Sequence, residues 1–196
     1  NFLEFGMSLL AQFIMKGQFR AILFACILGG FSQRFPPLAI FSSVIVSMYI
    51  LRKGEAEGLI VLIGTAAITY VMSFYIESRI GLDFPVALGL LIPVYLCSRV
   101  LRATESQGYA ITAAAACSAV FAFSVQLITG DAVLWWSGWL ETVVENVRGA
   151  TYEGFEEDGT ILVMNGLVAI LLGLSTISSI LIARWLQSIL YNPGGF

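Results

Sequence analysis

The sequence predicts an all-α fold, an integral membrane bundle of about six transmembrane helices. Hydrophobic residues make up 58% of the chain and charged residues only 12%, whereas charged residues supply roughly a quarter of an ordinary soluble domain. The apolar residues gather in about six runs, each roughly long enough to cross a hydrocarbon core of ~30 Å. These runs lie near residues 20–34, 36–51, 58–76, 84–98, 108–128 and 161–184. We therefore expect one transmembrane domain over residues 20–190.

The cationic residues fall between these runs, and their distribution predicts the orientation of the bundle. If the N-terminus is cytoplasmic, seven of the ten Lys and Arg residues lie inside, and Arg34, Arg79 and Arg148 lie outside. The seven inner cations are Lys16, Arg20, Arg52, Lys53, Arg99, Arg102 and Arg184. Because cytoplasmic loops carry an excess of Lys and Arg, we expect both termini in the cytoplasm.

Residues 1–19 precede the first run, and we expect an N-terminal interfacial helix there. Four apolar residues share one face of this helix: Leu9, Leu10, Phe13 and Ile14. An amphipathic helix of this kind lies in the membrane interface. Residues 1–6 precede a candidate initiator, Met7, and we expect them to be a remnant or an upstream start.

The first three runs are joined by short connections. Pro36 and Pro37 force a tight turn after the first run, because proline fixes φ and cannot continue a helix. Arg52 and Lys53 close the second run, where cations favour both a helix C-terminus and anionic headgroups. The third run carries small and polar residues, and we expect it to face other helices. These residues are Gly64, Thr65, Thr69, Tyr70 and Ser73.

The last three runs differ from one another in composition. Pro93 should kink the fourth, because it leaves a backbone carbonyl without its helical donor. The fifth is rich in alanine over residues 110–119, which allows close helix packing. The sixth ends at Arg184 and Trp185, an interface anchor pair. Residues 191–196 then form a turn signal that stops a helix.

The long outer loop over residues 129–160 is predicted to contain an amphipathic helix. Glu141, Glu145 and Arg148 lie on its polar face. The apolar residues that recur at helical spacing are Trp136, Trp139, Leu140, Val143, Val144 and Val147. We expect the tryptophans, with Trp135, at the depth of the lipid headgroups.

Several classes of chemistry are excluded by absent residue types. The chain contains no histidine, which excludes His-based catalytic triads and the usual zinc motifs. Cys26, Cys97 and Cys117 lie in apolar runs without a C-x-x-C pair, so we expect them to be packing residues. The sequence also lacks a P-loop and any acid or base at mid-membrane depth. We therefore expect no enzymatic activity, no metal or other cofactor, and no nucleic-acid partner.

Polar and aromatic residues gather at the predicted outer end and are candidates for a ligand site. They are Arg34, Glu77, Arg79, Gln126, Trp135, Trp136, Trp139 and Asn165. Polar groups within a bundle are costly unless they are paired, so Gln126 and Asn165 either bind a ligand or bond to each other. Glu77 and Arg79 could equally be solvated loop charges, and the tryptophans could be interface anchors only.

Small residues recur every four positions in the first run, at Ala21, Ala25 and Gly29. Such a strip lets two helix backbones approach closely. It packs either within the bundle or against a membrane protein partner, and the sequence leaves both alternatives open.

Two segments of the chain resemble the uncharacterised YybS-like family of bacterial polytopic membrane proteins. They are MSLLAQFIMKGQFRA, residues 7–21, and ARWLQSILYNPGGF, residues 183–196. Members of that family usually continue past the NPGGF turn, which implies that the natural chain continues after Phe196. The family in turn resembles the S components of energy-coupling-factor transporters. That likeness implies a six-helix bundle with a cytoplasmic N-terminus, an outer-facing pocket and a small-residue strip that docks on a coupling subunit.

Two functions follow as expectations. The first is a transporter-like component of the bacterial inner membrane that binds a small hydrophobic or amphipathic molecule and needs a partner for energy coupling. The alternative is a non-transporting scaffold or accessory subunit of a membrane protein complex. Both place the chain in the lipid bilayer.

Overall fold

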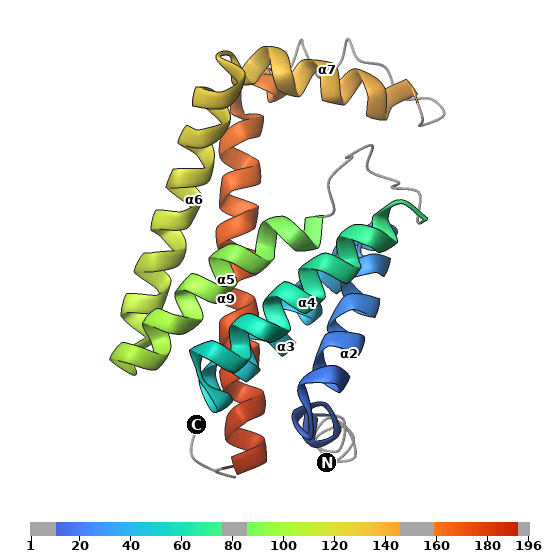
Figure 1. Ribbon diagram of the computed structural model, residues 1–196. Coiled ribbons are helices and arrows are strands. Elements are labelled where there is room, and N and C mark those ends of the chain that lie inside the picture. The colour runs from blue at the N-terminus through green and yellow to red at the C-terminus, as the bar shows by residue number, and fades with distance from the viewer. Residues whose placement is uncertain (1–10, 76–85, 146–158, 192–196) are drawn as a thin grey trace.

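The computed structural model describes residues 11–75, 86–145 and 159–191, and every regular element within them is a helix. The all-α prediction is therefore confirmed for this part of the chain. The elements are α2 (Gln18–Phe31), α3 (Leu38–Lys53), α4 (Glu55–Ser73), α5 (Val86–Thr104), α6 (Gln107–Thr129), α7 (Ala132–Glu145) and α9 (Thr160–Tyr191) (Figure 1). A short helical segment over residues 11–15 precedes α2.

Four of the described helices, α4, α5, α6 and α9, are long and apolar enough to cross a membrane. The prediction of about six full spans differs at the first two runs. There, α2 has 14 residues and α3 has 16, which correspond to roughly 21 and 24 Å at 1.5 Å per residue. Both fall short of a ~30 Å hydrocarbon core, because the turn at Pro36 and Pro37 removes residues from each helix.

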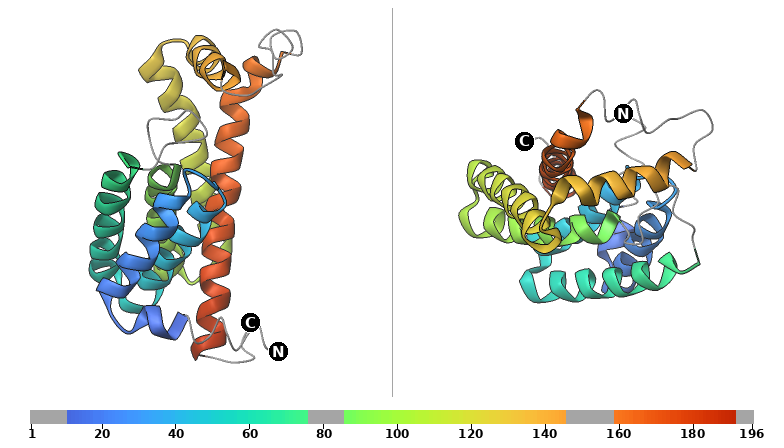
Figure 2. Two further views of the ribbon diagram at one scale, coloured as in Figure 1. Left: turned by 90° about the vertical axis from the view of Figure 1, so that its right-hand side faces the viewer. Right: turned by 90° about the horizontal axis from the view of Figure 1, so that it is seen from above.

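The helices from α2 to α6 run alternately up and down, so that α2 and α4 point in the same direction (Figure 1). The longest elements, α6 and α9, rise beyond the others, and α7 lies across their ends (Figures 1 and 2). We call this end of the bundle the α7 end. The start of α2 and the C-terminal end of α9 lie at the opposite end (Figure 1).

The central element is α3, which packs against α2, α4, α5 and α9. Ten of its 16 residues are buried. Two of its three buried serines make bonds to neighbouring helices: the Ser42 hydroxyl donates to the Ala25 carbonyl at 2.8 Å, and the hydroxyls of Ser47 and Ser98 share a bond of 2.8 Å. These bonds join α3 to α2 and α5, because a polar group in an apolar interior is costly unless it is paired.

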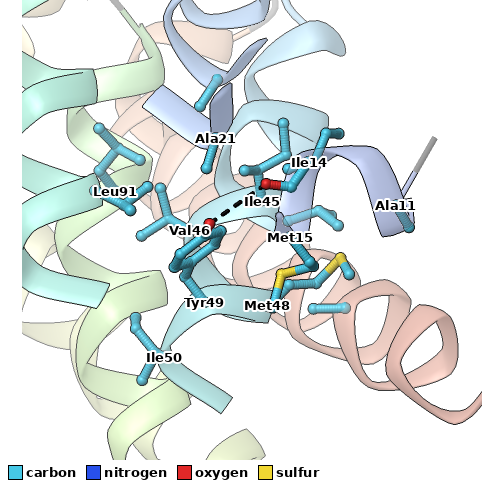
Figure 3. Packing of buried hydrophobic residues seen from close by; sticks show 14 residues of the cluster. Ala11, Ile14, Met15, Ala21, Ile45, Val46, Met48, Tyr49, Ile50 and Leu91 are labelled. Carbon is cyan, nitrogen blue, oxygen red and sulfur yellow. Dashed lines mark hydrogen bonds between the residues drawn. The ribbon is translucent and has the colours of Figure 1, made fainter. Parts of the chain in front are cut away.

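The predicted N-terminal helix is seen only in its described part, residues 11–15, and this part is held against the core. The Tyr49 hydroxyl on α3 donates to the Ile14 carbonyl at 3.3 Å (Figure 3). Ile14 and Met15 are buried beside Met48, while Phe13 is exposed. One face of the segment therefore packs on the bundle and the other remains available to the interface.

The connection between α3 and α4 is tight because it depends on two glycines, Gly54 and Gly58. Gly54 has a φ of 112°, a conformation that favours glycine. The Arg102 guanidinium donates to the Ile50 carbonyl at 2.7 Å, which satisfies one of the last carbonyls of α3. Arg99 on α5 forms an ion pair with Glu55 on α4 at 3.0 Å. The same end of the bundle thus holds α3, α4 and α5 together.

A methyl group at Gly58 would lie 3.0 Å from the Cα of Ile50, so we expect Gly58→Ala to push α3 and α4 apart. Overpacking of this kind costs about 1–3 kcal/mol, which outweighs the gain of roughly 1 kcal/mol in helix propensity. Gly89→Ala is the matched control, because nothing lies within 4 Å of its added methyl group. Thermal unfolding in detergent should show a lower melting temperature for Gly58→Ala only. Equal shifts in the two variants would contradict the close approach.

Candidate functional site

The corner between α6 and α7 is built by polar side chains that the sequence placed at the outer end. The carboxylate of Asp131 accepts a bond from the Val133 N–H at 2.9 Å and so caps the start of α7. The side chain of Gln126 donates to the Gly130 carbonyl at 3.0 Å and accepts from the Ala132 N–H at 3.3 Å. Gln126 therefore serves the turn between two helices.

Trp136 and Asn165 connect α7 to the ends of α9 and α6. The Trp136 indole N–H donates to the Asn165 side-chain oxygen at 3.4 Å, and the Asn165 amide donates to the Ala122 carbonyl at 3.0 Å. Only 4% of Trp136 is exposed. The indole sits in an apolar cluster that includes Ala132, Leu140 and Ile161. The prediction of a helix within residues 129–160 is thus confirmed over α7, which packs against α9 through buried residues such as Trp136 and Leu140.

The three tryptophans of α7 form a row of edge-to-face contacts. The ring centroids of Trp135 and Trp136 are 4.6 Å apart, and those of Trp136 and Trp139 are 5.5 Å apart. Trp135 is 44% exposed, whereas the Trp139 indole nitrogen is buried and has no hydrogen-bond partner. An unpaired buried donor costs about 1–3 kcal/mol. Among the three tryptophans of α7, Trp139 is the one whose indole nitrogen is buried without a partner in the described residues.

Other predicted site residues are placed elsewhere. Gln126 and Asn165 do not bond to each other, because each has the partners given above. Arg34 is exposed at the turn between α2 and α3, away from α7 (Figure 1). Glu77 and Arg79 lie outside the described residues. The structure therefore brings together Trp135, Trp136, Trp139 and Asn165.

The strip of small residues on α2 lies inside the bundle. Ala21 and Ala25 are fully buried. A methyl group at Gly29 would lie 2.7 Å from the Thr69 hydroxyl of α4 and 3.3 Å from the Ser42 hydroxyl of α3. This placement corresponds to packing within the bundle, and α3 and α4 cover the surface that a docking partner would need. Close approach of α2 to α4 is the physical role that the strip performs here.

Several buried hydroxyls were not among the predicted site residues. Ser43, Thr65 and Thr69 are fully buried, and none of the three hydroxyls has a hydrogen-bond partner. The side-chain nitrogen of Gln33 is buried and unpartnered as well. The sequence carried one usable signal: Thr65 and Thr69 are four residues apart in an apolar helix, which places them on one face. That face does point to other helices, as expected for the third run, whereas Tyr70 is exposed.

The residues that the structure describes contain no cluster of metal-ligating side chains, and a small cavity lies between three of their helices. No group of three or more Cys, Asp and Glu side chains in them could hold a metal ion. A small cavity of about 10 Å³ lies between α5, α6 and α9, lined by Leu101, Gln107, Ala110, Ile111, Ile177, Ile180 and Leu181. It has room for no more than about one water molecule, which is too little for an organic ligand.

Comparisons of the chain with protein-family models, with curated proteins and with solved structures found no match. The function must therefore be inferred from the residues and contacts of the chain itself.

We expect the bond between Trp136 and Asn165 to hold α7 on α9. Trp136→Phe and Asn165→Ala should each lower the free energy of unfolding, and a double-mutant cycle should give a coupling energy of about 0.5–1.5 kcal/mol. Ser137→Ala is the control, since its hydroxyl bonds only within α7, to the Leu134 carbonyl. Additive effects of the two substitutions would show that the bond contributes nothing.

Proposed function

We propose that the protein is a multi-pass component of the bacterial inner membrane that binds a small hydrophobic or amphipathic molecule at its outer end and needs a partner for energy coupling. The observation that carries this proposal is the buried, unpaired indole N–H of Trp139 beside the bonded pair Trp136 and Asn165. The resemblance of the chain to the YybS-like family, and through that family to S components, supports the same function.

The membrane assignment is supported by the exposed surface of α6. Val120, Phe123, Leu127 and Ile128 are between 66% and 83% exposed, and only 6% of the apolar part of α6 is buried. A continuous apolar surface of this kind is rare on soluble monomers. Lipid is the environment in which it is stable.

The orientation follows from the charges at the two ends. Among the described cations, Arg34 lies in the turn between α2 and α3, and the other seven lie near the start of α2 or near the C-terminal ends of α3, α5 and α9, at the opposite end of these helices. Cytoplasmic surfaces of membrane proteins carry the excess of Lys and Arg. This distribution supports an outer position for the α7 end and a cytoplasmic position for the end of the bundle at which α2 begins and α9 ends.

The chemistry of the tryptophan cluster, formed by Trp135, Trp136 and Trp139 with Asn165, defines the ligand class. The tryptophan rings offer apolar surface, and the Trp139 N–H needs an oxygen or nitrogen acceptor. Two acids lie near the cluster in sequence: Glu141 is exposed, and Asp131 is engaged in capping α7. A molecule with an apolar body and an uncharged acceptor, such as an ester or ketone carbonyl, satisfies these groups.

Energy coupling must come from a partner. In the described residues, charged side chains lie toward the helix ends, and none lies at the middle of a spanning helix. A proton-driven carrier usually needs a titratable group at depth, and the sequence has no P-loop for nucleotide. The scaffold function is the alternative outcome of the binding experiment below.

Trp139→Phe keeps an aromatic ring but removes the N–H, so we expect it to reduce ligand retention several-fold. The protein would be purified gently from native membranes, and native mass spectrometry would report the fraction that carries a small-molecule adduct. Trp185→Phe is the control, because Trp185 lies near the C-terminal end of α9, outside the tryptophan cluster of α7. A wild-type protein that carries a stoichiometric protein partner and no adduct would favour the scaffold function instead.

The orientation is tested with single cysteines in a variant that lacks Cys26, Cys97 and Cys117. Gly138→Cys lies on α7 and Ala103→Cys at the opposite end of the bundle, and both positions are exposed. A membrane-impermeant maleimide should label Gly138→Cys in spheroplasts and label Ala103→Cys only after lysis. The reverse pattern would place the α7 end in the cytoplasm.

A further inference from the structure

Two parallel helices, α2 and α4, meet along faces that match turn by turn. The contact between Gly29 and Thr69 fixes their register. One turn back along both helices brings Ala25 to the level of Thr65, and both residues are fully buried. The Ser42 hydroxyl of α3 lies beside the same contact and donates to the Ala25 carbonyl. We call Gly29, Ser42, Thr65 and Thr69 the hydroxyl seam.

The two threonines of the seam differ from other helical hydroxyls in this protein. A Ser or Thr hydroxyl within a helix commonly donates to the carbonyl four residues earlier. Seven hydroxyls in the described helices do so: Thr104, Thr112, Ser118, Thr129, Thr142, Thr176 and Ser179. Thr65 and Thr69 have no such bond and no other partner, although neither is exposed at all. Their hydroxyl groups are therefore available to a group in the seam.

The free hydroxyl hydrogens decide what kind of group fits. A bound cation would use the oxygen lone pairs, and each hydroxyl hydrogen would then need an acceptor such as its own helix carbonyl. Thr65 and Thr69 do not make that bond. An anion would need cationic partners, and no charged residue belongs to the seam or lies within four residues of Thr65 or Thr69 in α4. The seam therefore matches a neutral group that accepts, and can also donate, hydrogen bonds.

We propose that the hydroxyl seam binds a neutral oxygen-bearing group, a hydroxyl or carbonyl, inside the bundle. Water or a small uncharged molecule supplies this group, and the tight approach at Gly29 limits the part that enters the seam to a few atoms. The site is separate from the tryptophan cluster: its residues belong to α2, α3 and α4, whereas that cluster belongs to α7 and α9. The inference does not rest on the function proposed above.

The test is whether the melting temperature falls or rises when the two threonine hydroxyls are removed. Thr65→Val together with Thr69→Val replaces each hydroxyl by a methyl group of similar shape. If a bound group satisfies the hydroxyls, the double variant loses those bonds, and its melting temperature should fall by about 3 °C or more. If the seam is dry, removal of two unpaired hydroxyls should raise the melting temperature, and the proposal is overturned. Thr65→Ser with Thr69→Ser keeps the hydroxyls and should retain the bound group.

Thr176→Val is the matched control, because Thr176 is equally buried but its hydroxyl donates to the Leu172 carbonyl of its own helix. Its shift measures the loss of one such bond without a bound group. If the seam holds a bound group, the melting temperature of the double variant must fall by more than twice the shift of Thr176→Val. If the double variant does not fold, Thr65→Val and Thr69→Val apply the same sign test singly.

The source of the group is identified by two further measurements on the same proteins. A small-molecule adduct in native mass spectra that is lost in the valine pair but kept in Trp139→Phe identifies an organic ligand in the seam. A fall in melting temperature with no change in adducts identifies water. Replacement of sodium chloride by choline chloride should leave the wild-type melting temperature unchanged. A sodium-dependent rise that the valine pair abolishes would show a cation site and overturn the proposal.

Discussion

The burial of α3 among four other helices is the constraint on which the rest of the structure depends. An unpaired hydroxyl in this position is costly, and two of the buried serines of α3, Ser42 and Ser47, reach the Ala25 carbonyl and the Ser98 hydroxyl. These bonds set where α2 and α5 lie against it. The tight connection at Gly54 and Gly58 then determines where α4 begins. The order of α2 to α5 around one central helix follows from these contacts.

The different lengths of the helices divide the bundle into two parts. Because α2 and α3 are short, the α7 end of the molecule is carried by α6 and α9 alone (Figure 1). The tryptophan row of α7 therefore packs on α9 and the end of α6, and is joined to them by Asn165. The apolar surface of α6 remains open to lipid along most of its length.

The tryptophan cluster and the hydroxyl seam share one chemical property. Each holds hydrogen-bond donors that are buried, uncharged and without an acceptor: the indole N–H of Trp139 in one, and the hydroxyls of Thr65 and Thr69 in the other. Neutral donors of this kind suit uncharged ligands with carbonyl or hydroxyl oxygens. In the described helices, no charged side chain lies at the middle of a spanning helix, where a proton-coupled carrier usually holds one.

The helical class, the apolar runs and the amphipathic character of α7 were readable from the sequence, because they depend on composition and on periodicity along one chain. So was the closeness of Trp136 and Trp139, which are three residues apart on one helix. Only the tertiary structure decided that Ala21, Ala25 and Gly29 are buried inside the bundle, that Gln126 bonds to the turn after α6 and not to Asn165, and that Thr65 and Thr69 are left unpaired. Each of these depends on which helices become neighbours and at what register. A sequence pattern shows which face of a helix is small or polar, but it does not show what that face meets.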